Sequence, residues 1–531
     1  MLMLRPNVLL FLCDLMQIDQ NNEIRSTTCA LYTQLDILYK IFEILIEENT
    51  DLRLLILRHG SQVCTPWRGL LLSSPSLWGK SLNFDVLMGT PAWRDEVIRR
   101  SGESFAYITR LGSGRPHFDR EEELFLGSFI KNNWKRTKSL RIVLPVESVI
   151  TKIFDISLLQ SPHLHLEDLE VREHYLCLRD DDSSTLTLFT PVVERATWKA
   201  DFGGHAPRLR QYLTEQTFQF PYQSSWLPQL RELQVTVTAC LIPNLLDELR
   251  NMTSLEHLEL TLLEVLTADP DARTRMSNMV LPRLKYLEVN ATGHTPESID
   301  FVNYIKPAPG CIMQVIIDYW DALSPSDISS VVRALSAFPL HDGEDGMDDQ
   351  GWIGVHDSLL RIRSPRHEFL FRGPFESNLW TPCLQHFAAS PAYFDNATNV
   401  RLTLGKEVVD SISTPSADMT FSRILSNMTS VAHVSTDWIT LSLLRRLSFD
   451  DESNSESRKA LPALESISIS GHEADLNGLE VWLDCRATHT LKPIKRVNIY
   501  WHSEDYPSLE VFQRFTNLEI TLFDWRGGPK Y

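Results

Sequence analysis

The sequence has few cysteines, and none is arranged for metal binding or dithiol redox chemistry. Its eight cysteines form no Cys-x-x-Cys pair, and the nearest two, Cys13 and Cys29, lie 16 residues apart. Zinc ribbons, RING-type zinc sites and thioredoxin-like sites therefore lack their ligands. Eight cysteines in so long a chain do not make a disulfide scaffold, so we expect reduced thiols and a cytoplasmic or nuclear protein.

A surplus of positive charge is also absent. The chain has 51 Lys and Arg against 69 Asp and Glu, a formal net charge of −18. Proteins that bind nucleic acid need a surplus of basic residues to neutralise phosphates, so we expect no nucleic-acid partner. No run of about 18 apolar residues occurs, and we expect no membrane partner. The apolar run from Val8 stops at Asp14 without a small-residue cleavage site, so we expect no secretory signal.

Three catalytic motifs begin in the sequence and are not completed. Gly79-Lys80-Ser81 matches the end of a phosphate-binding loop, but Ser74 stands where the first glycine is required. Gly112-Ser113-Gly114 lacks the third glycine of a dinucleotide site. His472-Glu473 is followed by Leu476, where a zinc-protease helix needs a second histidine.

Two further candidates for chemistry have simpler interpretations. His163-Leu164-His165 offers two metal ligands without a third, and we interpret it as the start of a strand. Cys64 has no histidine nearby in the sequence and is interpreted as a small core residue. The sequence therefore predicts no enzyme, with no catalytic residue, no metal site and no cofactor.

The composition is that of a folded protein, with 43% hydrophobic and 23% charged residues among 531. At about 150 residues per domain, this length predicts three or four globular units or one elongated repeat protein.

Three short helices are predicted near the N-terminus. From Asp36 to Glu48 apolar residues recur at helical spacing and form one broad face. A second helix is predicted over Asp51–His59, ended by Gly60, and a third over Gln62–Leu72. So small a bundle has a marginal core and tends to need a partner or a neighbouring domain.

The same residues resemble an F-box as found in fungal F-box proteins. Ser61–Leu82 resembles its second half, most specifically in Val63-Cys64, Trp67-Arg68 and Pro75-Ser76-Leu77-Trp78. Asp36–Leu45 resembles its first helix.

The resemblance implies a substrate-recognition subunit of a cullin-type (SCF) ubiquitin ligase, not itself an enzyme. In that family the F-box docks on the small Skp-family adaptor, and a C-terminal domain holds a protein substrate. The residues to which the resemblance assigns adaptor binding are Ile37, Leu38, Ile41, Leu45, Val63, Trp67, Leu77 and Trp78.

Two departures from the F-box pattern leave alternatives open. Thr33-Gln34 replaces the usual Leu-Pro opening, and Pro66 falls in the third helix, where an interior proline costs about 3 kcal/mol. The second hypothesis is therefore a leucine-rich-repeat-like scaffold that binds a protein without joining a ubiquitin ligase. The third is an enzyme with an unrecognised site.

The rest of the chain repeats a template with apolar residues at positions 0, 3, 6 and 8. Segments starting at Leu227, Met252 and Leu281 follow it at spacings of 25 and 29 residues. Segments starting at Leu441, Leu461 and Leu491 follow it at spacings of 20 and 30 residues. These spacings are typical of leucine-rich repeats.

Helical segments alternate with these predicted strands, which indicates parallel strands. They are Glu121–Trp134, Pro243–Arg250, Ser324–Leu335, Leu476–Arg486 and Ser508–Phe515.

The predicted fold is α/β: a small three-helix F-box followed by an irregular leucine-rich-repeat-like solenoid with a parallel sheet. A doubly wound α/β domain is the competing fold. The predicted boundaries are 1–32 N-terminal segment, 33–82 helical bundle, 83–103 connecting helix and 104–531 repeats, with acidic loops at 180–182, 341–349 and 450–457.

Overall fold

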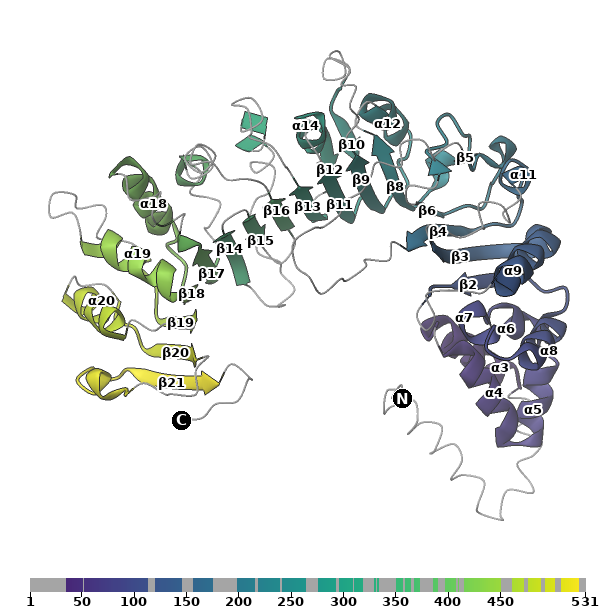
Figure 1. Ribbon diagram of the computed structural model, residues 1–531, viewed down its shortest axis with the longest axis horizontal. Coiled ribbons are helices and arrows are strands. Elements are labelled where there is room, and N and C mark those ends of the chain that lie inside the picture. Colours follow the sequence, from purple (N-terminus) through teal and green to yellow (C-terminus); the bar gives the residue numbers. More distant parts are fainter. Residues whose placement is uncertain are drawn as a thin grey trace. The chain divides into compact units, whose positions relative to one another are not determined.

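The computed structural model divides the chain into two units, unit 1 up to Val235 and unit 2 from Thr236. Each is described here by itself (Figure 1). The structure describes residues 35–50, 52–112, 120–145, 156–174, 198–214, 218–238, 241–263, 276–292, 296–308, 310–318, 329–330, 332–333, 350–356, 359–363, 367–372, 385–389, 397–406, 409, 415–449, 461–471, 476–488, 492–501 and 508–524.

Unit 1 begins with a cluster of short helices. They are α3 (Leu35–Glu48), α4 (Arg53–Val63), α5 (Thr65–Leu72), α6 (Pro75–Gly79), α7 (Phe84–Leu87) and α8 (Pro91–Ser101). The predicted first helix is confirmed. Pro66 lies in the first turn of α5, where its missing N–H has no helical partner to lose, so the proline is harmless there.

Gly60 does not end the second helix, because α4 continues to Val63. A Cβ at Gly60 would lie 2.9 Å from Phe42 Cε1 and 2.9 Å from Leu71 Cδ1. The glycine therefore lets α4 approach α3 and α5 closely, and it serves packing rather than helix termination.

The parallel sheet of unit 1 follows the order of the chain. Its strands are β1 (Leu82–Asn83), β2 (Ala106–Arg110), β3 (Thr137–Pro145), β4 (Asp168–His174), β6 (Gln211–Thr214) and β8 (Glu232–Thr238). Each pairs in parallel with the next in this series. The sheet starts at Leu82, directly after the helices and ahead of the predicted start at 104. The helix α9 (Arg120–Asn133) confirms the one predicted over Glu121–Trp134.

The strands of unit 2 form a large, mostly parallel array. Its strands are β9 (His257–Leu263), β11 (Tyr286–Thr292), β13 (Ile312–Asp318), β14 (Gln350–His356), β15 (Leu359–Arg363), β16 (His367–Arg372), β17 (Asn399–Leu404), β18 (His433–Asp437), β19 (Ser466–Gly471), β20 (Arg496–Trp501) and β21 (Glu519–Asp524). The pairing order is β9, β11, β13, β16, β15, β14, β17, β18, β19, β20 and β21.

The pairs β14–β15 and β15–β16 are antiparallel, and the other pairs in this order are parallel. The three strands from β14 to β16 thus form a meander set into the sheet in reverse chain order.

Helices of unit 2 connect and cover these strands. They are α12 (Ile242–Leu249), α14 (Pro296–Tyr304), α18 (Pro415–Asn427), α19 (Trp438–Phe449) and α20 (Leu476–Thr488). The helices predicted over Pro243–Arg250 and Leu476–Arg486 are confirmed. The helix predicted over Ser508–Phe515 is wrong as an α-helix, because only a 3₁₀ turn forms, at Glu510–Phe512.

The repeated apolar template marks the core. In the repeat that starts at Leu281, positions 3, 6 and 8 are Leu284, Leu287 and Val289, all at most 1% exposed. The matching positions after Leu227, Met252 and Leu461 are equally buried. In each of these repeats the N–H of position 3 donates to the carbonyl oxygen of position 0, as Leu284 does to Leu281 over 3.3 Å. This turn directly precedes the strand.

Two predictions of strands are wrong. Leu441–Phe449 is helical, as part of α19. His163-Leu164-His165 precedes β4 as a loop rather than starting it. The predicted first 32 residues, Thr33-Gln34, the three acidic loops and the helix start at Ser324-Pro325 lie outside the described residues. No helix in the described part of the chain is both long and apolar enough to cross a membrane.

Candidate protein-binding surfaces

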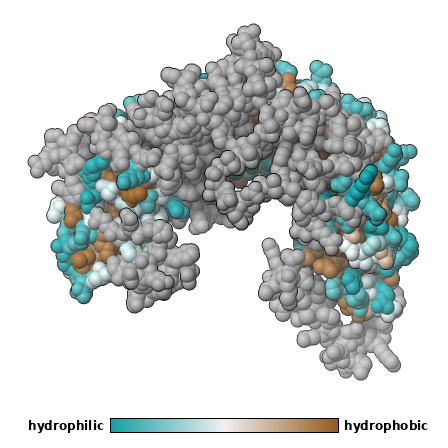
Figure 2. All heavy atoms as spheres, in the orientation of Figure 1, coloured by the Kyte–Doolittle hydropathy of each residue, from teal (hydrophilic) through white to brown (hydrophobic). Residues whose placement is uncertain are grey.

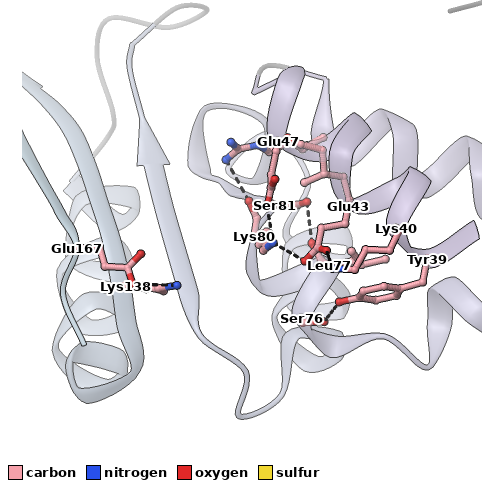
Figure 3. A network of polar contacts seen from close by, with 12 residues as sticks. Tyr39, Lys40, Glu43, Glu47, Ser76, Leu77, Lys80, Ser81, Lys138 and Glu167 are labelled. Carbon is pink, nitrogen blue, oxygen red and sulfur yellow. Dashed lines mark hydrogen bonds and ion pairs between the residues drawn. The ribbon is translucent and has the colours of Figure 1, made fainter. Parts of the chain in front are cut away.

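Helix α3 is fixed to unit 1 by its polar side. Lys80, directly after α6, places its Nζ 2.8 Å from Glu43 Oε1 and 2.6 Å from Glu47 Oε1 (Figure 3). One turn earlier, Tyr39 Oη lies 2.8 Å from Ser76 Oγ. Tyr39, Glu43 and Glu47 are spaced four residues apart and lie on one face of α3. Their contacts therefore fix the rotation of α3 about its own axis.

The pKa of Glu43 reports this contact. Hydrogen bonds from Lys40 and Lys80 lower the pKa of Glu43 from 4.5 to about 2. Burial lowers the pKa of Lys80, but its bonds to Glu43 and Glu47 outweigh this and raise it above 10.5. Both groups are therefore charged at neutral pH.

The apolar anchor of α3 consists of Phe42 and Ile46, which are at most 1% exposed. The rings of Phe42 and Trp67 meet edge to face, with centroids 5.3 Å apart. Trp67 is thus half-buried against α3, and its role in this structure is core packing.

An apolar stripe remains on the side of α3 that faces away from these contacts. Ile37 is 59% exposed and Ile44 is 51% exposed. Leu38, Ile41 and Leu45 are half-buried beside them. At 100° per residue these five side chains span about a third of the helix circumference. We call them the α3 stripe; Figure 2 shows apolar residues reaching the surface of unit 1 among polar ones.

The structure corrects the expectation that Leu77 and Trp78 face a partner. Both have 0% exposed surface. Trp78 Nε1 donates to the carbonyl oxygen of Leu71 over 2.8 Å, and the Arg100 guanidinium carbon lies 4.7 Å from the Trp78 ring centroid. Because α8 and the end of α5 enclose Trp78, it holds the helices together and offers no surface.

Of the predicted adaptor-binding set, the structure brings four residues together on α3: Ile37, Leu38, Ile41 and Leu45. Val63 is 39% exposed at the end of α4, a different helix. The sequence analysis missed Ile44, which follows Ile37 by seven residues, two helical turns later. Completing that spacing would have found it.

The helices are joined to the sheet by backbone contacts within unit 1. Asp85 of α7 accepts from the N–H of Leu111 over 2.7 Å and of Gly112 over 3.0 Å. A Cβ at Gly79 would lie 2.3 Å from the carbonyl oxygen of Phe105. The end of α6 therefore rests directly on the backbone that leads into β2.

A second candidate surface is the strand face of unit 2 opposite the buried leucines. On β9 and β11, His257, Glu259, Tyr286 and Glu288 occupy this face and are half-buried. The rings of His257 and Tyr286 stack with centroids 4.3 Å apart and planes 15° apart.

Toward the end of unit 2 the same face carries hydroxyls together with charges of both signs, such as the ion pair of Arg496 and Glu519. Ser466 and Ser468 lie on β19, and His433 Nδ1 is 2.7 Å from Ser466 Oγ. On the following strands, Tyr500 and Phe523 stack with centroids 4.9 Å apart. Two segments of one unit thus present different chemistry.

His163, one of the residues considered for chemistry, has a structural role. His163 Nε2 lies 2.8 Å from the carbonyl oxygen of Trp134, and its Nδ1 accepts from Leu166 N over 3.0 Å. Burial lowers the pKa of His163, so the ring is neutral at pH 7. The described residues contain no group of three His, Cys, Asp or Glu that could hold a metal ion.

Comparison with known protein families and with curated proteins returned no match.

Proposed function

We propose that this chain is the substrate-recognition subunit of a cullin-type ubiquitin ligase. The helices of unit 1 act as an F-box that docks on a Skp-family adaptor, and a repeat array of leucine-rich-repeat type holds a protein substrate. The chain supplies positioning rather than bond chemistry, because a held substrate reaches a high effective concentration near the conjugating enzyme.

The observation that supports a contact with the adaptor is the α3 stripe. Phe42, Ile46 and the polar contacts through Lys80 already fix α3, so Ile37 and Ile44 are not needed for its packing. Large apolar side chains grouped on one exposed helical face are typical of a helix that binds a partner.

The order of the strands supports the repeat array. In the main sheet of unit 1 the strands β1, β2, β3, β4, β6 and β8 lie in chain order and pair in parallel, whereas a doubly wound sheet reverses its order at a switch point. In unit 2 the register pairs His257 with Tyr286 and Tyr286 with Ile312, spacings of 29 and 26 residues. Such spacings are typical of leucine-rich repeats.

The second candidate is a protein-binding scaffold that does not join a ubiquitin ligase. The burial of Leu77 and Trp78 favours it, because these two residues of the F-box resemblance serve the core instead of a partner. The two candidates differ only in whether the adaptor binds.

The test is capture of a purified Skp-family adaptor by the full chain. We expect the parent to bind it and the double variant Ile37→Asp, Ile44→Asp to lose roughly 1,000-fold in affinity, since two exposed apolar contacts worth about 2 kcal/mol each sum to about 4 kcal/mol. Both side chains are more than half exposed, so the variant keeps the fold.

The matched control is Met419→Asp with Val481→Asp, on α18 and α20 of unit 2. These residues are 62% and 50% exposed, so the control adds the same charge at equal exposure. If the parent does not bind the adaptor, the scaffold hypothesis replaces the ligase hypothesis. If the α3 variant and the control bind the adaptor equally well, the adaptor contact lies outside the α3 stripe.

A further inference from the structure

Strands β9, β11 and β13 of unit 2 have a second face, opposite the helices, whose side chains are mostly half-buried. Figure 1 shows α12 and α14 together on one side of these strands. The side chains that point toward the helices, such as Leu260, Val289 and Val315, have no exposed surface. Their neighbours along each strand point to the other side.

One register row on this face holds two carboxylates. The sheet register aligns Glu259 with Glu288, and Glu288 with Gln314. Adjacent strands lie about 4.8 Å apart, so Glu259 and Glu288 are close neighbours of like charge. Like charges directly opposite each other destabilise a sheet.

In the part of the chain that the structure describes, no Lys or Arg side chain contacts either of these two carboxylates. Glu259 Oε1 is 2.8 Å from His257 Nε2, and Glu288 accepts from Tyr286 Oη over 2.6 Å and from Asn290 Nδ2 over 2.8 Å. No outward position of β9, β11 or β13 is Lys or Arg. These neighbours hold both carboxylates in place, and His257 forms an ion pair with Glu259 when its ring is protonated.

The row lies beside the stacked pair of His257 and Tyr286, two residues earlier on each strand. Guanidinium groups stack on aromatic faces and pair with carboxylates through two parallel hydrogen bonds. An aromatic pair next to a row of fixed carboxylates offers both contacts to one arginine side chain.

We infer that this face binds an extended, arginine-rich segment of a partner protein. The inference deepens the proposed function and rests on it, because it takes this face to be the substrate-holding surface. Charge complementarity selects the occupant: an acidic segment is repelled, and an apolar one leaves the carboxylates desolvated and unpaired.

The test uses the full chain and a fluorescent peptide of alternating Arg and Ser, with binding followed by anisotropy. We expect the parent to bind this peptide and to lose affinity as salt increases. The double variant Glu259→Gln, Glu288→Gln should bind roughly tenfold more weakly, as two partly exposed charge pairs together are worth about 1.4 kcal/mol. A peptide with citrulline at each arginine position should not bind.

The control corrects for the overall negative charge of the chain. Glu510→Gln with Glu519→Gln removes the same two charges from exposed positions elsewhere in unit 2, and it should bind the peptide as the parent does. The inference is overturned if this control loses as much affinity as the Glu259, Glu288 variant, or if the parent does not bind the peptide at low salt.

The two proposals fail separately. Glu259→Gln with Glu288→Gln should leave adaptor capture unchanged, since both residues lie in unit 2. A parent that captures the adaptor and shows no peptide preference refutes the arginine-rich partner alone. Peptide binding that depends on Glu259 and Glu288, without any adaptor capture, refutes the ligase role and leaves this face as a binding surface of a scaffold.

Discussion

Lys80 Nζ lies 2.8 Å from Glu43 Oε1, and this contact joins the end of α6 to the polar side of α3. It determines which side of α3 is turned outward. A helix with five apolar residues on one face would be expected to bury that face, yet a smaller anchor of Phe42 and Ile46 is buried and the stripe stays outside. The polar contacts of α3 therefore determine which of its side chains are exposed to a partner.

The contact between Glu43 and Lys80 predicts that the stability of the fold depends on pH. Its pKa is lowered in the folded state from 4.5 to about 2, so the stabilisation is complete above 4.5 and is lost as the pH falls toward 2. The melting temperature of Glu43→Gln should be below that of the parent at pH 7, and the difference should shrink below about pH 4.5. A difference that stays constant across this range would show that the charge of Glu43 contributes nothing.

Trp78 should matter for stability rather than for partner binding. Replacing Trp78 by Ala should cost about 3–5 kcal/mol. Trp78→Phe should cost less, about 1 kcal/mol, because it removes one of two donors to the carbonyl oxygen of Leu71, which keeps the N–H of Ser74. Calorimetry measures the loss. The folded Trp78→Phe variant should capture the adaptor as well as the parent does; lost capture at an unchanged melting temperature would contradict the core role.

Two glycines of the helical region should respond to alanine with opposite signs. Gly79→Ala places a Cβ 2.3 Å from the carbonyl oxygen of Phe105, so backbone must move and the melting temperature should fall. Gly69, inside α5, has no atom within 4 Å of the added Cβ, and Gly69→Ala should stabilise by about 0.5–1 kcal/mol through helix propensity. Equal responses from both variants would show that α6 does not rest on the chain at Phe105.

Charges placed at the buried positions of the repeat that starts at Leu281 should unfold unit 2. Leu284→Asp with Leu287→Asp buries two unpaired carboxylates at positions no more than 1% exposed, at a cost of several kcal/mol. Limited proteolysis should then cleave unit 2 readily. The control Arg283→Asp with Lys285→Asp changes exposed neighbours in the same segment and should resist proteolysis like the parent.

The sequence predicted the strands well where two signals agreed. Leu281 begins both the apolar template and a Leu-Pro-x-Leu segment, and the strand predicted there is confirmed as β11. At Leu441 only the apolar spacing was present. Leu441, Leu444 and Leu447 are buried, but a spacing of three also fits a helix, and α19 forms.

A local signal for α19 was present in the sequence and was not used. Asp437 Oδ1 accepts from the N–H of Thr440 over 2.6 Å, so it caps the helix that begins at Trp438. An aspartate before a long apolar segment with no turn residue favours a helix start. The orientation of α3 was beyond such reasoning, because the bond between Lys80 and Glu43 joins residues 37 positions apart.

The reversed meander of β14, β15 and β16 has a consequence for how unit 2 assembles. A parallel array in chain order can grow by adding one strand at a time to its last neighbour. Here β13 pairs with β16, and β17 pairs with β14, so growth from either side stops until the three strands have formed together. Antiparallel neighbours with short connections form within about 1–10 μs, much faster than distant parallel strands find each other. We therefore expect the meander to form before it pairs with β13 on one side and with β17 on the other.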